Sequence, residues 1–126
     1  MKPASCLAVG IMLGAFAVSA TVRVRAQDPV EVSPQYNVVR FDNDRVRVLE
    51  LHMKPDEREA MHSHPPHVVY VLTDFTMRNV LPDGTSSQAA RKAGEVFWRD
   101  ATTHTAQNVG TTEARAIAVE LKPCAR

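Results

Sequence analysis

Cysteine is scarce in this chain, and so is any excess of charge of one sign. Only Cys6 and Cys124 are cysteines among 126 residues, and 15 basic residues against 14 acidic ones leave a formal net charge of +1. Because there is no basic run either, the sequence offers no electrostatic surface for nucleic acid. It also lacks a glycine-rich phosphate loop and any Ser–His–Asp set. No nucleic-acid partner is therefore expected.

The N-terminal segment has the pattern of an export signal. Lys2 gives a short basic start, and residues 4–20 are almost continuously small and apolar. This run is short for a membrane span, which needs roughly 20 residues. We therefore predict a signal peptide over residues 1–26, cleaved after Ala20 or Ala26, with an uncleaved anchor as the alternative. Either way the domain is expected to be periplasmic or secreted, with no other membrane contact.

Removal of that segment would take Cys6 with it. Cys124 would then be the single cysteine of the mature chain, so no internal disulfide is expected. Its place near the C-terminus favours an incidental thiol over a nucleophile.

The remaining sequence has no helical apolar period and reads as strands throughout. Short β-prone runs are separated by turn signals such as Pro82-Asp83-Gly84-Thr85. This pattern predicts an all-β, antiparallel sandwich or barrel over residues 36–123, preceded by an extended N-terminal arm at 27–35. The apolar run 68–72 is expected to be buried on both faces. The expected strands are 36–41, 46–51, 68–72, 75–81, 86–91, 95–98, 103–109 and 114–121.

Histidine supplies the candidate chemistry. His62 and His64 are two residues apart, a spacing that puts both imidazoles on one side of an extended segment. His104 begins a later strand, which an antiparallel barrel can bring opposite the pair. Converging neutral imidazoles are ligands for divalent metals. Histidine-rich loops are often merely solvated, so the pair alone does not decide between the two interpretations.

The flanking residues resemble the two sequence motifs of the cupin superfamily. The first motif contains His-x-His followed by a glutamate, and here His62-Ser63-His64-Pro65 leads into the apolar strand. The second contains His-x3-Asn, which His104 to Asn108 matches after Gly94. The resemblance covers residues 34–123 and implies a single cupin, a jelly-roll-like antiparallel β-barrel with the metal at His62, His64 and His104.

This sequence departs from the cupin motifs at several positions. Asp56 stands where the first motif opens with glycine, and Val68 or Val69 stands where it has the metal-binding glutamate. Three outcomes remain open: a three-histidine site with water in the free positions, replacement of the glutamate by His67, or loss of the metal. Iron, manganese, nickel, copper and zinc are all chemically admissible.

The closer resemblance is to small single-domain cupins named as β-alanine degradation proteins of the BauB type. It rests on residues 43–49, 61–65, 81–84 and 113–122 and says little about chemistry. By analogy with cupins the expected partners are a small-molecule ligand and a second copy of the chain in a homodimer. The expected function is a metal-dependent enzyme with a dioxygenase- or isomerase-like reaction. The alternative is a non-catalytic module that binds a small molecule or the metal.

Four further residues carry expectations of their own. Tyr70 is expected to line the cavity, provided that the strand keeps its alternation through Pro65-Pro66, and Trp98 is expected at the cavity or its mouth. Asn108 is expected to brace the turn at Gly110. His52 lies outside both motifs and is expected at the surface.

Overall fold

The structure, a computed structural model, describes residues 27–124. The expected signal peptide lies outside these residues. Within them no helix is long and apolar enough to cross a membrane. One short helix and nine strands are present. These are α1 (Pro29–Val32), β1 (Asn37–Asp42), β2 (Val46–Met53), β3 (His62–His64), β4 (His67–Val71), β5 (Phe75–Val80), β6 (Ser86–Arg91), β7 (Val96–Arg99), β8 (Thr102–Asn108) and β9 (Ala114–Leu121).

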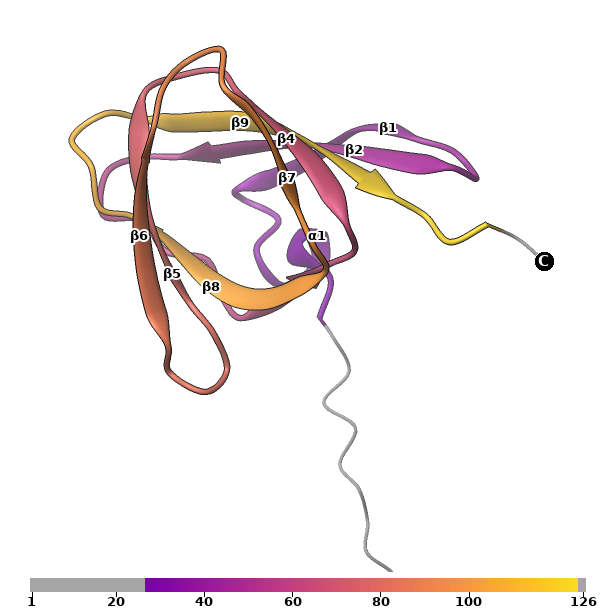
Figure 1. Ribbon diagram of the computed structural model, residues 1–126, viewed down its shortest axis with the longest axis horizontal. Helices are drawn as coiled ribbons and strands as arrows, with labels where there is room; N and C mark the ends of the chain where they lie inside the picture. The colour runs from indigo at the N-terminus through magenta and orange to yellow at the C-terminus, as the bar shows by residue number, and fades with distance from the viewer. Residues whose placement is uncertain (1–26, 125–126) are drawn as a thin grey trace, which may run out of the picture.

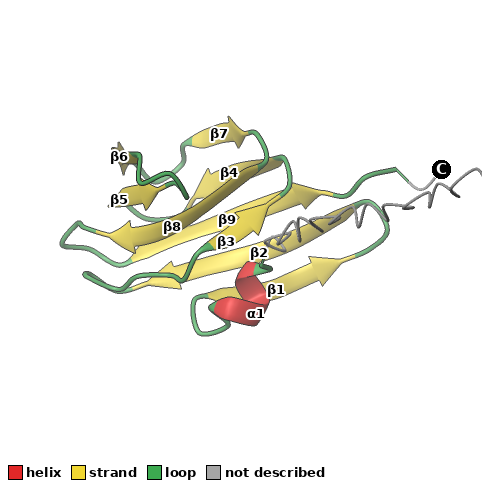
Figure 2. Cartoon of the chain, turned by 90° about the horizontal axis from the view of Figure 1, so that it is seen from below, coloured by secondary structure: helices red, strands yellow, loops and turns green. Residues whose placement is uncertain are grey.

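The strands form two antiparallel sheets that face each other as the walls of a barrel. One sheet has the order β1-β2-β9-β4-β7 and the other the order β3-β8-β5-β6. Figure 1 looks into the barrel, with β2 and β9 on one wall and β8 on the opposite wall. Figure 2 views the same strands from below. The all-β, antiparallel barrel predicted from the sequence is confirmed.

The chain crosses from one sheet to the other between β3 and β4. His64 ends β3, and His67 begins β4 after only Pro65 and Pro66. Proline cannot donate a backbone hydrogen bond, so two prolines fit a corner where strand pairing stops. Because two residues separate the histidines, the alternation of side chains shifts by one position. His64 and His67 therefore both point inward.

The barrel interior follows this shifted alternation. On β4, Val69 and Val71 are buried with His67. On β9 the inward positions are Ala114 and every second residue to Glu120. Small alanines on one wall leave room for larger side chains from the other, as close packing requires. The core consists of Met53, Val69, Val71, Phe75, Met77, Ala106, Ala114 and Ala116.

The outer face of the five-stranded sheet is not covered by the described chain. Tyr70 on β4 is 46% exposed, so the prediction that this strand is buried on both faces is wrong. One cross-strand row on this face is apolar over all five strands. It consists of Phe41, Val48, Val119, Val68 and Trp98. A parallel row contains Val38, Glu50, Ile117, Tyr70 and Val96.

The N-terminal arm is folded rather than extended. Asp28 caps the single turn of α1 by accepting a hydrogen bond from the Val30 backbone N–H at 2.8 Å. Pro29 occupies the first helical position, where its fixed φ angle suits a helix start. The backbone carbonyl of Gln27 also accepts from Ser63 on β3, 2.8 Å away. The arm is thus fixed beside the strand that carries His62 and His64.

Two positions of the cupin motifs, the departing Asp56 and the matching Asn108, lie at turns. Asp56, at the glycine position of the first motif, has a φ of 67°. Aspartate is one of the few residues other than glycine that enter this left-handed region readily. Asn108 accepts from the Gly110 N–H at 3.1 Å and donates to the Thr112 carbonyl at 2.8 Å. Its expected role in bracing the turn is confirmed.

Candidate metal centre

Three histidines meet at the end of the barrel where β3 pairs with β8. His62 and His104 are direct cross-strand partners, and their ring centroids are 4.8 Å apart. His64 lies two residues along β3 on the same face, with its ring centroid 4.7 Å from that of His62. One nitrogen from each ring lies within 4.8 Å of the other two. The strand register thus brings the three residues together as the sequence predicted.

Hydrogen bonds fix which nitrogen His62 and His64 present to the centre of the triad. Nδ1 of His62 donates to the Ala60 carbonyl at 2.7 Å, and Nδ1 of His64 donates to Glu120 at 2.6 Å. In a neutral imidazole the other nitrogen, Nε2, then carries a lone pair. The two Nε2 atoms are 2.9 Å apart. This separation is close to the roughly 3 Å expected between two imidazole nitrogens bound to one ion at about 2.0–2.1 Å.

Burial keeps His62 and His104 neutral. Burial, together with the neighbouring His62, Arg99 and His64, lowers the pKa of His104 to about 2. Burial also lowers the pKa of His62, although nearby Glu59 acts in the opposite direction. Both ring nitrogens of His104 are buried without a hydrogen-bond partner in the described chain. A neutral, unpartnered imidazole of this kind is ready to bind a metal ion.

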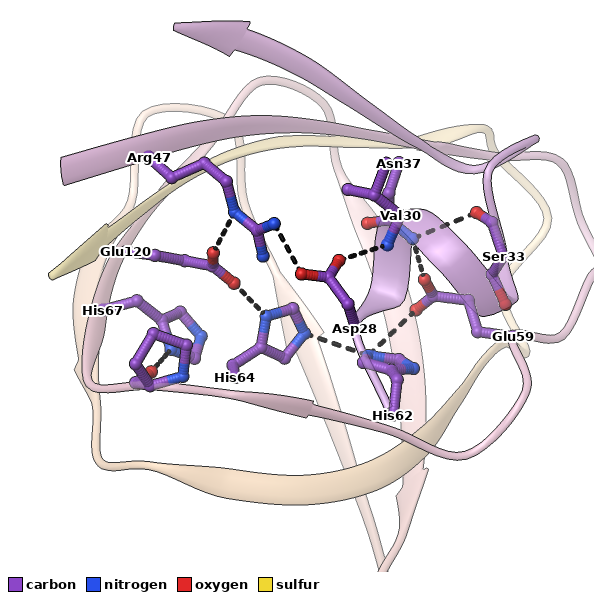
Figure 3. Close-up of polar contacts among 11 residues, drawn as sticks. Asp28, Val30, Ser33, Asn37, Arg47, Glu59, His62, His64, His67 and Glu120 are labelled. Atoms are coloured by element: carbon purple, nitrogen blue, oxygen red, sulfur yellow. Dashed lines mark hydrogen bonds and ion pairs between the residues drawn. The ribbon is translucent and has the colours of Figure 1, made fainter. Parts of the chain in front are cut away.

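A second layer of charged residues holds His64 in place. Glu120 accepts a hydrogen bond from His64 Nδ1 through one carboxylate oxygen, while its other oxygen accepts from Arg47 Nε at 2.8 Å. Arg47 also donates to Asp28 at 2.6 Å. Figure 3 shows this chain of contacts from Asp28 to His64. Burial alone would raise the pKa of Glu120, but the bonds from His64 and Arg47 outweigh it and lower the pKa.

Glu59 is the carboxylate on the other side of the triad. It is 4% exposed and lies in the loop before β3. One oxygen is held by the Asn37 amide at 2.5 Å, and the other lies 3.9 Å from Nε2 of His62. The motif position for glutamate is filled by the apolar Val69. Glu59 therefore places a carboxylate near the imidazoles from a different part of the chain.

His67 is close to the triad without joining its set of converging nitrogens. Its ring centroid lies 4.9 Å from that of His64. Nδ1 donates to the Pro65 carbonyl at 2.8 Å, which leaves the lone pair on Nε2. Burial lowers the pKa of His67. The ring is thus a neutral base on the cavity wall.

The cavity extends from the histidines through the barrel and has a volume of about 100 Å³. A single water needs about 10–15 Å³ by the same kind of measure, so there is room for a small organic molecule. Its walls are mainly apolar, with polar groups near both ends. The lining includes Asn37, Leu51, Glu59, His64, His67, Val69, Phe75, Met77, Asn79, Arg91, Phe97, Arg99 and His104.

Tyr70 does not line this cavity, and Trp98 lies outside it. The shift in alternation at Pro65-Pro66 turns Val69 inward and Tyr70 outward. On β7, Phe97 and Arg99 face inward, while Trp98 is 52% exposed. Trp98 borders a groove on the outside of the cavity mouth, and its indole N–H donates to Asp100 at 3.0 Å. Val69 occupies the cavity position that the sequence analysis assigned to Tyr70, and Phe97 lines the cavity itself while Trp98 lies at its mouth.

The sequence analysis missed the charged residues around the triad. Glu120 could have been found from the sequence, because it is the last inward residue of β9 and the other inward residues of that strand are alanines. Arg47 and Glu59 have no such pattern, since their partners lie 73 residues away in Glu120 and 22 residues away in Asn37. His52 lies at the surface as expected, 2.9 Å from Glu113.

Comparison with solved structures identifies the barrel type. A cupin domain from Bordetella pertussis Tohama I has a TM-score of 0.64 and 27% identity, over 69% of this chain and 92% of that one. A Klebsiella pneumoniae protein with a double-stranded β-helix domain has a TM-score of 0.55 and 20% identity, over 81% and 88% of the two chains. The fold is therefore that of a cupin.

The polyketide cyclase RemF from Streptomyces resistomycificus is a third similar structure. Its TM-score is 0.50 at 24% identity, over 68% of this chain and 63% of the cyclase. No family model matches the sequence, and no curated protein matches it. The likeness to solved structures thus rests on the barrel, and the chemistry has to be argued from the residues of this chain.

Proposed function

We propose that this protein is an exported cupin that binds one divalent transition-metal ion through His62, His64 and His104, and acts there on a small organic molecule. Iron, manganese, nickel, copper and zinc all accept imidazole ligands, and the three histidines do not discriminate among these metals.

The proposal that the protein is exported rests on residues 1–26. An N-terminus at residue 21 or 27 in protein recovered outside the cytoplasm would support it, and an intact cytoplasmic chain would contradict it.

The convergence of imidazole nitrogens is the observation that carries the proposal. Two lone-pair-bearing Nε2 atoms at 2.9 Å repel each other unless a cation or a proton lies between them. Burial disfavours the proton, because it lowers the pKa of His62. His104 adds a third nitrogen that has no other partner in the described chain. A metal ion would satisfy all three rings at once.

The residues around the triad would orient the ligands, accept a proton and exclude water. Glu120 fixes the ring of His64, and Glu59 is placed to offer a carboxylate oxygen to the ion. A bound metal would supply Lewis acidity, or redox chemistry in the case of iron, manganese, nickel or copper. His67 would accept a proton at Nε2 from a ligand in the cavity. The apolar walls would exclude water from the bound molecule.

Elemental analysis of protein purified without a histidine tag tests the metal site. We expect about one transition-metal ion per chain, as in other three-histidine centres, and none in the His62→Ala/His104→Ala variant. His52→Ala is the matched control, because it removes an exposed histidine, and it should keep the metal. In Glu59→Gln the affinity should fall while the stoichiometry stays the same. Absence of metal in the wild-type protein after soaking would overturn the proposal.

A non-catalytic binding module is the alternative. It is favoured by the shortage of proton-transfer groups in the cavity, where Glu59 is held by Asn37 and only His67 is left as a base. In that case the protein would bind its ligand reversibly and release it unchanged. Turnover of any ligand that is lost in His104→Ala would decide in favour of an enzyme.

A second copy of this chain is the protein partner that we propose. The apolar row from Phe41 to Trp98 crosses the outer face of the five-stranded sheet, and contiguous exposed patches of this kind mark interfaces. A twofold axis through the face would lay the row of one copy against the row of the other. Two sheets can pack face to face in this way.

Light scattering coupled to size exclusion tests the dimer. Phe41→Glu puts a charge into the proposed interface and should convert a dimer into a monomer without loss of fold. Leu81→Glu is the control, because Leu81 is also an exposed apolar residue, 37% accessible, but follows β5 on the other sheet. A wild-type protein that is monomeric, or a Phe41→Glu variant that stays dimeric, would contradict this assignment.

A further inference from the structure

We propose that the cavity binds a small organic carboxylate, with Arg99 holding the carboxylate group next to the histidine triad and the rest of the molecule lying along the apolar wall. The role of Arg99 stands on its own residues. The role of the triad rests on the proposed function. The argument starts from a row of four polar residues on the inner face of the five-stranded sheet.

This row runs across four neighbouring strands and has an arginine at each end. Arg47 on β2 is the partner of Glu120 on β9, which is the partner of His67 on β4, which in turn is the partner of Arg99 on β7. Directly paired residues have Cβ atoms about 4.5–5.5 Å apart. Arg99 therefore lies beside His67, at the side of the row away from Arg47.

The two arginines differ in their partners. Arg47 has two carboxylates, Glu120 at 2.8 Å and Asp28 at 2.6 Å. Arg99 has no acidic partner within 4.0 Å and no side-chain hydrogen bond among residues 27–124. Burial lowers the pKa of Arg99, and the nearby positive charge of Arg91 lowers it as well. A partly buried guanidinium without a partner is costly, and an anionic ligand would remove that cost.

Arg99 also stands where a ligand would enter. Five residues line both the cavity and the outer groove: Asn79, Ala89, Arg91, Phe97 and Arg99. Arg91 also lies there, with its guanidinium 3.9 Å from the centre of the Phe97 ring and a nitrogen 3.5 Å from the Glu95 carboxylate. Asn79 contributes a buried side-chain oxygen that has no partner in the described chain. The mouth is thus polar, and Arg99 is its arginine without a carboxylate partner among residues 27–124.

The apolar part of the cavity would determine which chemical group can be attached to the carboxylate. Beyond the paired Arg99 and His67, the wall is formed by the next inward cross-strand pair, Val69 and Phe97, and by Phe75, Met77 and other apolar residues. A planar guanidinium can contact a carboxylate or a phosphate through two parallel hydrogen bonds, and the apolar walls favour the less strongly charged carboxylate. A short carboxylic acid with an apolar chain fits this arrangement. A bulky or multiply charged anion would meet apolar walls.

Chemical-shift titration of isotope-labelled protein with butyrate and with the neutral amide butyramide tests the inference. We expect butyrate to bind at least about 10-fold more tightly, and Arg99→Gln to weaken butyrate binding about 10- to 100-fold, as loss of a charge-assisted hydrogen bond implies. Arg99→Lys should restore part of the affinity. Arg78→Gln is the control, because it removes an exposed arginine on the outer side of β5, and it should bind like the wild type.

The titration is run on metal-free and on zinc-loaded protein, with inorganic phosphate as a second anion. Butyrate binding that depends on Arg99 without zinc supports the anion site even if no metal binds. Zinc binding without any butyrate binding would overturn the anion site and leave the metal proposal standing. Equal affinity for butyrate and butyramide, undiminished binding in Arg99→Gln, or preference for phosphate would each overturn it as well.

Discussion

The metal-free protein should lose stability steeply as the pH falls below about 6.5. His104 has a folded-state pKa of about 2 and an ordinary pKa near 6.5 when unfolded. Between these two pH values the unfolded chain binds a proton that the folded chain does not. The free energy of unfolding therefore decreases as the pH is lowered. At pH 4.5 His104 alone should remove about 3 kcal/mol, a large part of the 5–15 kcal/mol of a typical domain.

Other buried groups act in the same direction. The pKa values of His62 and His67 are lowered by burial, so they add to the loss over the same window. The pKa of Glu120 is lowered too, and its contribution is lost at still lower pH. A bound metal should delay the transition, because it competes with protons for the same nitrogens.

Denaturant unfolding between pH 7.5 and 4.5 measures this effect. His104→Leu should flatten the pH dependence, because it removes the most strongly perturbed group and leaves an apolar side chain. His52→Gln should leave the dependence unchanged, since that histidine is exposed. If the free energy of unfolding of the metal-free protein is the same at pH 7.5 and 4.5, the buried histidines are not neutral as the structure implies.

Removal of the Glu120 side chain should cost both stability and metal affinity. Glu120→Ala leaves Arg47 with Asp28 as its single carboxylate and frees the ring of His64. Breaking a buried pair in this way costs about 3–5 kcal/mol. Loss of the residue that orients a metal-binding histidine lowers metal affinity about 10- to 100-fold. Glu120→Gln should be milder in stability, because the amide oxygen can still accept from His64.

A surface pair offers the matched control. Glu113 contacts His52 at 2.9 Å, and both side chains are about half exposed. Exposed ion pairs contribute little to stability, so Glu113→Ala should change stability little and metal affinity not at all. Unfolding curves and zinc titrations of the two alanine variants give the comparison. Equal effects in both would mean that Glu120 does not support the site.

The local pattern of the sequence was enough to predict the barrel, and the resemblance to the two cupin motifs was needed to predict the triad. Alternating apolar residues and turn signals mark most strands, and His62, His64 and His104 are placed by strand spacing and by cross-strand register. The partners of the triad could not be predicted in the same way. Glu59, Glu120 and Arg99 acquire their roles only when distant strands are aligned, and a single sequence does not specify that alignment.

Tyr70 shows a different limit of sequence analysis. Its expected place in the cavity assumed that inward positions continue unchanged from His64 along the next strand. The corner at Pro65-Pro66 moves the alternation by one residue, and Val69 takes the inward position. Residue type alone would also have favoured Tyr70, since a tyrosine can offer a hydroxyl to a ligand. The corner formed by Pro65 and Pro66, which lie outside the strand, therefore determines that Tyr70 faces away from the cavity.

The number of residues in this corner also determines which side chains of β4 line the cavity. If one proline were deleted, every side chain of β4 would exchange faces, because strand alternation has a period of two. Tyr70 would enter the cavity, and His67 and Val69 would turn to the solvent. A single-codon change between two strands could therefore convert the wall of the cavity from apolar to hydroxyl-bearing without any substitution on the strand itself. Related barrels with corners of different length would present different ligand walls from similar strand sequences.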